Sequence, residues 1–290
     1  MSAIIVHYET PELLAQCLAA LRASEGVAIE ALVIDNASRD FGTDEIETWL
    51  PGARVIRNSR NSGFAVAANL GLCAGSGRYL LLLNPDTIVE PDTLATMVRY
   101  MDQRPQVGCA TARLVMENGK LDLACRRSFP TPQRALYRLS LLSRVWPRSR
   151  RFGQYNLTYL DELAEAEIDA PCGAFMMVRA EVIEDIGLLD ESYFMYGEDL
   201  DWAFRMKSAG WQVMYNPGAT ALHFKRASST KARSRSIRAF YGAMRIFYSR
   251  HYEETYPKAV SWLIYRAIDG REAIELASAR VRSPLHGAGA

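Results

Sequence analysis

The chain has 290 residues, of which 49% are hydrophobic, and its formal net charge is +1. This length suits one large domain, or one domain with an appendage, and the composition can fill a sizeable core. A chain so close to neutral lacks the overall positive charge that binds polyanions, so we expect no nucleic-acid partner.

The cysteines and the apolar runs indicate where the protein works. Five cysteines lie far apart, at positions 17, 73, 109, 125 and 172, with no CxxC pair and no histidine at zinc-binding spacing. The opening IIVHY is too short for the apolar core of a signal peptide, and the longest apolar runs, such as YLLLL, are far shorter than a membrane span. We therefore expect a cytoplasmic protein whose only membrane contact is peripheral, on the inner face of the plasma membrane.

Short apolar runs alternate with helical patterns over the first 115 residues. We predict strands at 3–8, 29–35, 53–58, 78–86 and 107–116, and helices at 11–24, 41–50, 63–75 and 91–105. This alternation, with nearly continuous apolar strands, is typical of an α/β fold with a mostly parallel central sheet that helices cover on both faces.

The second half of the chain is less regular. Residues 126–170 break the alternation with eight arginines and no acid up to Arg151, followed by an acidic stretch. We predict strands at 173–179, 211–217 and 219–224, with helices at 180–187 and before Gly210, and then helices over the last sixty residues. The domain boundaries that we expect are 1–225 for the main domain and 226–290 for a C-terminal helical region. Within the main domain, residues 1–115 form a nucleotide-binding half and residues 116–225 a catalytic half with a basic insertion at about 126–170.

Polar residues stand at the ends of four predicted strands: His7-Tyr8, Asp35-Asn36, Arg57-Asn58 and Asn84-Pro85-Asp86. Ligands of parallel α/β sheets bind at the carboxyl ends of the strands, so we expect a binding site there. HYETPE follows the first strand without a glycine, which argues against a dinucleotide fingerprint.

Asp35 and the start of the third predicted helix each have a structural and a functional interpretation, of equal weight for Asp35, while the motif at the helix start is a weak signal by itself. Asp35 either caps a turn or accepts a hydrogen bond from the N3–H of a pyrimidine base. Asn61, Gly63 and Asn69 surround a helix start, which is either a plain cap or a site whose backbone N–H groups hold an anion or a nucleoside.

Asp86 has a more specific interpretation. Pro85 ends an apolar strand and fixes the direction of Asp86. A single carboxylate suits a divalent cation that is already bound to a diphosphate, because Mg²⁺ keeps water and phosphate oxygens as ligands. The alternative is an ordinary turn residue.

The stretch YFMYGEDLDWAF places acids among aromatic residues. Asp201 and Arg205 are four residues apart, which predicts an ion pair along a helix. Glu198 and Asp199 either cap that helix or include a general base in a pocket walled by Phe194, Tyr196 and Trp202. His223, which ends a later strand, is a candidate metal ligand.

Six motifs together resemble the family 2 glycosyltransferases of GT-A fold, in particular bacterial rhamnosyltransferases that extend lipid-linked or cell-wall glycans. Their order and spacing match from about residue 3 to 225. They are Asp35-Asn36-Ala37-Ser38, Asn61-Ser62-Gly63-Phe64, Asn84-Pro85-Asp86, Pro171-Cys172-Gly173-Ala174, Gly197-Glu198-Asp199 and His223.

The resemblance implies a nucleotide-sugar donor, a divalent cation and an inverting displacement. Asp86 would hold Mg²⁺ or Mn²⁺ with His223 as a further ligand, and Asp199 would deprotonate the acceptor hydroxyl, with Glu198 as the fallback base. Asp35 would bind the base of the nucleotide. Around the nucleotide sugar we expect Val6, His7, Tyr8, Asp35, Asn36, Asn58, Asn61, Gly63, Phe64, Asn69, Asn84 and Asp86. Around the sugar and acceptor we expect Cys172, Gly173, Ala174, Tyr196 and Trp202.

The sequence departs from the family pattern at two places. Asn84 stands where the family's DxD motif has its first Asp, which implies weaker metal binding. Tyr8-Glu9 stands where relatives commonly have Tyr-Asn, which bears on contacts near the nucleotide.

The function that these residues predict is transfer of a sugar to a hydroxyl of a cell-surface glycan or a lipid-linked saccharide. By resemblance the donor is TDP-rhamnose, with UDP-sugars as the runner-up, and a homo-oligomer is compatible with the sequence. One alternative is a nucleotidyltransferase, which would require a glycine-rich loop with Lys or Arg after the first strand, where this chain has HYETPE. The other is a non-catalytic protein that binds nucleotide sugars or glycans, which the departure at Asn84 favours.

Two basic segments have further interpretations. Residues 134–152 form either a solvated, partly packed helical insertion or an interfacial anchor that presents arginine to anionic lipid or to a lipid diphosphate acceptor. Residues 225–238 follow His223 and could close as a lid over the donor diphosphate.

Overall fold

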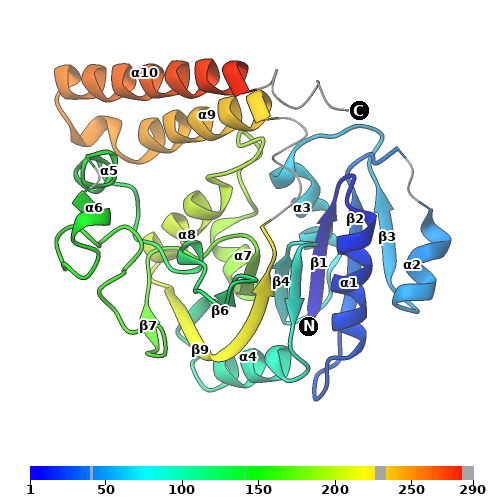
Figure 1. Ribbon diagram of the computed structural model, residues 1–290. Helices are drawn as coiled ribbons and strands as arrows, with labels where there is room; N and C mark the ends of the chain where they lie inside the picture. Colours follow the sequence, from blue (N-terminus) through cyan, green and yellow to red (C-terminus); the bar gives the residue numbers. More distant parts are fainter. Residues whose placement is uncertain (40–41, 141, 226–232, 283–290) are drawn as a thin grey trace.

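A nine-stranded sheet flanked by helices forms the centre of the protein in a computed structural model that describes residues 1–39, 42–140, 142–225 and 233–282 (Figure 1). The strands follow the order β3-β2-β1-β4-β8-β6-β9-β5, and β7 pairs with β9 beside this path. The α/β class predicted from the sequence is confirmed.

The first four strands form a parallel sheet: β1 (Ser2–His7), β2 (Glu30–Asp35), β3 (Arg54–Arg57) and β4 (Tyr79–Leu83). β4 is buried along its whole length and β1 and β2 nearly so, which is why they read as continuous apolar runs. In register, His7 lies beside Asp35, and Asp35 beside Arg57. The polar strand ends therefore meet at one edge of the sheet.

The rest of the sheet is mixed: β5 (Thr87–Val89), β6 (Val107–Val115), β7 (Ala166–Glu167), β8 (Phe175–Arg179) and β9 (Gln212–His223). β8 runs antiparallel to both β4 and β6, whereas β6 and β9 are parallel. The expectation of a mostly parallel sheet thus holds for the first four strands only. The long segment after β6 brings the chain back to the sheet in the opposite direction, and apolar patterning does not record strand direction.

β9 is one strand where the sequence predicts two. Its pairing with β6 slips between Ala112 and Arg113, so that Pro217 and Gly218 fall in an irregularity between two paired stretches. A proline can stand there because it lacks the N–H of a regular ladder position. The apparent break in the pattern is therefore a bulge within a continuous strand.

Six helices accompany the strands of the main domain. They are α1 (Pro11–Arg22), α2 (Thr43–Trp49), α3 (Phe64–Ala74), α4 (Thr93–Asp102), α7 (Ala180–Ile186) and α8 (Glu198–Ser208). α1 shows why they form: Pro11 occupies its first turn, and Leu14, Cys17, Leu18 and Leu21 repeat at helical spacing and are buried.

The basic insertion contains little regular structure. It follows η1 (Leu123–Cys125) and includes α5 (Pro132–Leu139) and α6 (Leu142–Val145). Phe152 holds it together by packing against Tyr137 and Trp146, with ring centroids 5.1 and 5.7 Å away. The Val145 and Trp146 side chains stay exposed. Both interpretations of residues 134–152 remain predictions.

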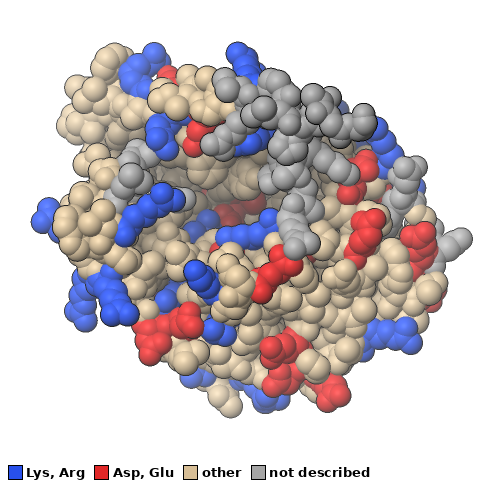
Figure 2. All heavy atoms as spheres, in the orientation of Figure 1, with Lys and Arg blue, Asp and Glu red and all other residues tan. Residues whose placement is uncertain are grey.

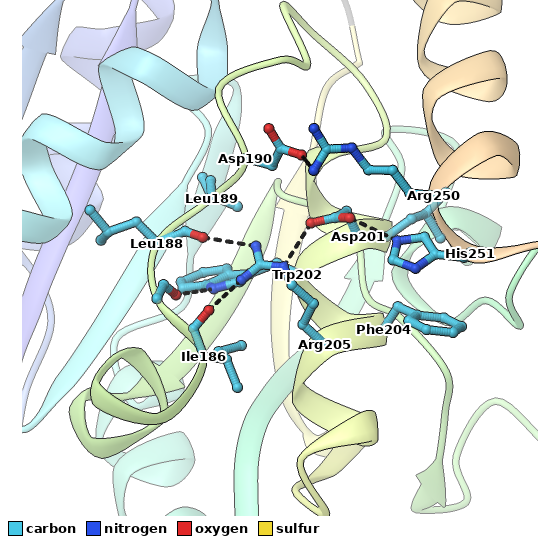
Figure 3. A network of polar contacts seen from close by, with 12 residues as sticks. Ile186, Leu188, Leu189, Asp190, Asp201, Trp202, Phe204, Arg205, Arg250 and His251 are labelled. Atoms are coloured by element: carbon cyan, nitrogen blue, oxygen red, sulfur yellow. Dashed lines mark hydrogen bonds and ion pairs between the residues drawn. The ribbon is translucent and has the colours of Figure 1, made fainter.

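Two long helices, α9 (Arg233–His251) and α10 (Lys258–Arg282), form the expected C-terminal helical region, joined by η2 (Glu253–Thr255) (Figure 1). Figure 3 shows how α9 is attached: His251 Nε2 lies 2.8 Å from Asp201 Oδ1, and Arg250 pairs with Asp190. Of the stretch expected as a lid, residues 226–232 fall outside the described part and residues 233–238 begin α9. No described helix combines the length and the hydropathy that membrane crossing requires.

Candidate active site

Asp35 lies at the carboxyl end of β2, beside a hollow of about 470 Å³ lined by Ala37, Ser38, Arg57, Asn58 and Ser59. The side chain of Asp35 is fully buried. Its Oδ1 accepts a hydrogen bond from the Ser38 amide at 3.0 Å, and its Oδ2 faces Arg57 Nε at 3.1 Å. Oδ1 therefore binds the chain itself, whereas Oδ2 forms an ion pair with Arg57 and has no hydrogen-bond partner among the described residues. Arg57 stands between Asp35 and the hollow.

The end of β1 completes this corner of the site. His7 is buried, and its Nδ1 lies 3.2 Å from Thr10 Oγ1. Burial lowers the pKa of His7, although Asp35 opposes the shift. Val6 is half-buried and Tyr8 is exposed. Glu9, at the position of the second departure, has a φ of 57° and its amide donates to Ser38 Oγ at 2.9 Å, so this residue shapes the loop locally.

Asn36 holds the loop before α3 in place. Its Nδ2 donates to Asn61 Oδ1 and to the Gly63 carbonyl, both at 3.1 Å. Its Oδ1 accepts from Asn58 Nδ2 at 3.0 Å and from the Ser62 amide at 3.2 Å. Three asparagines predicted at the nucleotide are thus brought together, and in this structure they bind one another.

The same loop contacts the segment that contains the acids. The Phe64 amide donates to the Phe194 carbonyl at 2.7 Å. Gly63 has a φ of 94°, and a Cβ placed on it would lie 2.4 Å from that carbonyl oxygen. Only glycine allows this approach. Asn69 acts one turn further on, where its side chain binds the Leu189 backbone through both its oxygen (3.0 Å) and its nitrogen (2.9 Å), away from the hollow.

Asp86 and His223 face each other, as the metal-site prediction requires. His223 pairs with Thr87 across β5 and β9, and its Nε2 lies 3.4 Å from Asp86 Oδ1. Its Nδ1 lies 2.8 Å from Asp122 Oδ2, and Lys225 Nζ donates to Asp122 Oδ1 at 2.6 Å.

Electrostatics favour charge on this cluster although it is buried. Burial opposes ionisation of both His223 and Asp122. Hydrogen bonds to Asp122 and Asp86 nevertheless raise the pKa of His223 to about 9. Hydrogen bonds from His223 and Lys225 lower the pKa of Asp122 to about 2.

These residues fit a divalent cation. Asp122 fixes the imidazole so that Nε2 points at Asp86, which is how histidine ligands of metals are commonly oriented. In the part of the chain that the structure describes, no three potential metal ligands form a group. A cation held by Asp86 and His223 would complete its shell with substrate oxygens and water, as Mg²⁺ does. Asn84 contributes to the turn through its backbone, since its amide donates to the Ala174 carbonyl at 3.1 Å.

Asp199 is the more firmly held of the two candidate bases. Its Oδ2 accepts from Arg127 Nη2 at 2.7 Å and from the Gly173 amide at 3.1 Å, and its Oδ1 accepts from the Leu200 amide. Arg127 also donates to the Pro171 carbonyl. The carboxylate is thereby fixed between the start of α8 and the turn at residues 171–173.

Glu198 differs from its neighbour. It is buried, and its Oε2 has no hydrogen-bond partner among the described residues. Burial, and then the charge of Asp199, raises the pKa of Glu198 above its ordinary range. Arg127 pairs with Asp199 and not with Glu198, so Glu198 lacks a directly paired cation.

The residues predicted around the acceptor differ in their surroundings, and their role stays a prediction. Gly173 lies against the Phe64 ring, and Cys172 and Ala174 are buried beside it. Burial raises the pKa of Cys172 to about 12, so its thiol stays neutral. Tyr196 is exposed and packs edge-on against Phe240 of α9, with centroids 5.9 Å apart. Trp202 is fully buried and donates to the Gly187 carbonyl at 3.0 Å, so it supports α8 from the core.

Asp201 faces away from the other two acids. The predicted ion pair with Arg205 is present at 2.9 Å. Figure 3 shows that Asp201 also binds His251, so it joins α8 to α9. Burial opposes ionisation of Asp201, but hydrogen bonds from His251 and Arg205 lower its pKa.

Two functional side chains were not found from the sequence. Asp122 comes from the segment after β6, and Arg127 comes from the basic insertion. Arg126 and Arg127 are adjacent in an extended segment, so they point to opposite sides, Arg126 towards Tyr215 and Arg127 towards Asp199. Figure 2 shows a hollow on this face of the molecule, beneath α9, with acidic and basic atoms on its floor.

Comparison with known proteins gives this site a family context. A family model described as glycosyltransferase like family 2 matches residues 1–242. The N-acetylglucosaminyl-diphospho-decaprenol L-rhamnosyltransferase of Mycobacterium tuberculosis is 24% identical over 97% of this chain and 94% of its own length. Rhamnosyltransferase WbbL of Escherichia coli is 26% identical over 55% of this chain and 57% of its own length.

Solved structures agree on the fold. The crystal structure of S. aureus TarS 1-349 has a TM-score of 0.56 at 15% identity, covering 84% of this chain and 63% of that one. The structure of GalNAc-T7 with UDP, GalNAc and Mn²⁺ has a TM-score of 0.57 at 17% identity, covering 82% and 47%. Both are glycosyltransferases of GT-A fold. With the family model matching most of its length, this chain belongs to glycosyltransferase family 2 and has the GT-A fold.

Proposed function

We propose that this protein is an inverting glycosyltransferase that moves rhamnose from TDP-rhamnose to a hydroxyl of a lipid-linked saccharide. The full-length similarity to an N-acetylglucosaminyl-diphospho-decaprenol L-rhamnosyltransferase supports rhamnose as the sugar and a lipid-linked acceptor. TDP as the nucleotide is the part of the proposal that follows from the resemblance of the motifs.

One observation supports transfer most directly. The turn at residues 172–174 connects a candidate cation site with a candidate base. On one side the Asn84 amide donates to the Ala174 carbonyl at 3.1 Å, and on the other the Gly173 amide donates to Asp199 Oδ2 at 3.1 Å. A donor diphosphate and an acceptor hydroxyl that bind on the two sides of this turn would meet above it.

In the proposed reaction Asp199 accepts the proton of the acceptor hydroxyl. The hydroxyl oxygen attacks the anomeric carbon, and the bond from that carbon to the diphosphate oxygen breaks, so the electron pair leaves with the diphosphate. This single displacement inverts the anomeric centre and needs no protein nucleophile. The thiol of Cys172, protonated because it is buried, takes no part.

Asp86 and His223 would hold a divalent cation, which when bound offsets the negative charge that develops on the leaving diphosphate. Asp122 keeps the His223 ring in the orientation that this requires. Arg57 and Asn58 line the hollow beside Asp35, and in this proposal they contact the nucleotide. Direct binding of the base by Asp35 would require Arg57 to turn away from its Oδ2.

The experiment that tests this proposal is a calorimetric titration with TDP, UDP, GDP and ADP, each with and without Mn²⁺. We expect TDP to bind, and to bind more tightly with Mn²⁺. TDP-rhamnose and a polyprenyl-diphospho-N-acetylglucosamine should then give a product of inverted anomeric configuration, as read by NMR. If the folded protein binds none of the nucleotides, Asp35 and Asp86 are turn residues and the proposal is wrong.

A further inference from the structure

The outward face of α10 consists of apolar residues that nothing in the described structure covers. Counting along the helix by three and four places Ala259, Leu263, Ala267, Gly270, Ile274 and Ala277 in one stripe, the outer face. All six are exposed, with Leu263 at 59% and Ile274 at 60%. The opposite side of the helix packs against α9, where Tyr248 Oη lies 2.9 Å from Ser261 Oγ.

The acidic and basic side chains of α10 differ in their exposure. Its basic residues Lys258, Arg266, Arg271 and Arg280 are all exposed. Its three acids are half-buried and all are engaged in ion pairs: Asp269 and Glu272 with Arg245 of α9, and Glu275 with Arg271. Arg266 and Arg271 pair with Asp269 and Glu275 of the same helix, so among the described residues the positive charge left beside the apolar outer face comes from Lys258 and Arg280. Figure 2 shows mainly uncharged atoms along the upper edge of the molecule, where α10 lies.

We propose that the outer face of α10 binds the surface of an anionic lipid bilayer. An apolar stripe with basic residues beside it is the composition of helices that lie in a membrane interface. Trp262, which is 61% exposed next to the stripe, is of the residue type that gathers at the headgroup level. Anionic headgroups would meet the positive charge of α10, as they attract basic segments in general.

The same charges argue against a second copy of the chain as the occupant. Two α10 helices meeting by their outer faces would bring the positive charges of Lys258 and Arg280 from both copies together, while the acids remain paired with arginines of α9 and α10. Like charges at such a contact oppose association, whereas a bilayer with anionic headgroups relieves them.

This inference deepens the proposed function and rests on it for one point only, the delivery of a lipid-linked acceptor. α9 connects α10 to the site, since Phe240 of α9 packs against Tyr196 and His251 binds Asp201. A membrane held at α10 would keep the acceptor diphosphate near the hollow beneath α9, so that the saccharide reaches Asp199 without leaving the bilayer.

The test uses the full chain and sedimentation with vesicles, in the absence of donor and acceptor. We expect binding to vesicles of phosphatidylcholine mixed with phosphatidylglycerol, weaker binding at high salt, and none to phosphatidylcholine alone. The double variant Leu263→Asp/Ile274→Asp should lower binding at least about tenfold. Leu163→Asp is the matched control, because Leu163 is equally exposed (68%) and lies outside α10. Unchanged thermal melting would show that all variants fold.

Three outcomes would overturn the inference: no vesicle binding by the wild type, equal binding by the double variant, or a dimer in solution that the double variant splits. Nucleotide titration of the same samples separates this inference from the proposed function. A protein that binds TDP with Mn²⁺ but not vesicles contradicts the membrane contact alone. A protein that binds vesicles but no nucleotide contradicts the proposed transfer alone.

Discussion

At the scale of single residues, the site depends on charged side chains that act through others. Asp122 orients His223, and Arg127 holds Asp199. The sequence pointed to His223, Asp86 and Asp199 because each stands at the end of a predicted element. It could not point to their partners, since Asp122 and His223 are 101 residues apart and Arg127 and Asp199 are 72 apart. Contacts at such separation depend on the fold as a whole.

The first prediction concerns the base. Asp199→Asn keeps the shape of the side chain and removes its ability to accept a proton. We expect the transfer rate to fall by at least about a hundredfold, with TDP binding unchanged. Glu198→Gln should retain most of the transfer, because that carboxyl is already protonated at neutral pH in the folded protein. Initial rates and titration calorimetry measure both. Transfer at the wild-type rate by the Asp199 variant would move the base to Glu198 or remove it from the reaction.

The second prediction concerns the orientation of His223. Asp122→Asn removes the carboxylate behind the imidazole, so Mn²⁺ affinity in the presence of TDP should fall by about 10- to 100-fold. Electron paramagnetic resonance of free Mn²⁺ measures this affinity without turnover. Asp102→Asn is the control, since Asp102 binds Tyr79 and Arg78 at the other end of β4. Equal Mn²⁺ affinity in both variants would show that Asp122 has no part in metal binding.

At the scale of elements, the sequence predicts where strands and helices form better than how these elements pair and pack with one another. The four parallel strands and α1 were predicted because their apolar residues repeat at the right spacing. A buried strand is an apolar run in either direction, so the sequence does not predict that β8 pairs antiparallel with β4. The sequence predicts a strand boundary at Pro217, where the structure has a bulge, because a bulge and a loop have the same residue pattern. The sequence likewise does not predict the contact between the loop before α3 and the segment before α8.

That contact supports the third prediction. Gly63→Ala would suffer both from its left-handed φ of 94° and from a collision with the Phe194 carbonyl. Gly52→Ala separates the two effects, because Gly52 has a φ of 80° and open space around it. We expect Gly52→Ala to lose about 1 kcal/mol of unfolding free energy and Gly63→Ala clearly more. Chemical denaturation measures both. Equal losses of unfolding free energy would mean that the loop before α3 moves to accommodate the added methyl group without further destabilising the protein.

At the scale of the whole molecule, α9 joins the main domain through polar and aromatic contacts, several of which are made with α8, and α10 packs on α9. Asp201 binds both Arg205 within α8 and His251 of α9, and Phe204 stacks on the same histidine with centroids 4.1 Å apart. The acids in the aromatic run thus have two different locations: Asp199 lies at the candidate active site, and Asp201 lies at the contact between α8 and α9. Stability and the site are therefore coupled through one short helix.

The fourth prediction is a pH dependence of global stability. The raised pKa of Glu198 means that, above the ordinary glutamate range, the folded chain binds a proton that the unfolded chain has lost. This bound proton adds to the free energy of unfolding. The addition is fully present below the pKa that Glu198 has in the unfolded chain. It is lost, by up to about 1.4 kcal/mol per pH unit, as the pH rises towards the pKa that Glu198 has in the folded chain. Unfolding free energies of Glu198→Gln should therefore fall less with rising pH. Glu254→Gln, at an exposed position, should follow the wild type, and parallel curves for all three proteins would contradict the prediction.

The strand order has a consequence for the time course of folding. β8 lies between β4 and β6, and β5 pairs only with β9. During synthesis β4, an apolar strand, therefore keeps one open edge until residues 175–179 have emerged, and β5 has no neighbour until residues 221–223 have followed. Pairings over such distances form slowly, and an open apolar edge is prone to association with other chains. Newly made chains would depend on protection, by a chaperone or by rapid completion of translation, for about half of the time that the ribosome needs to make them, from the end of β4 at Leu83 to His223 in a chain of 290 residues.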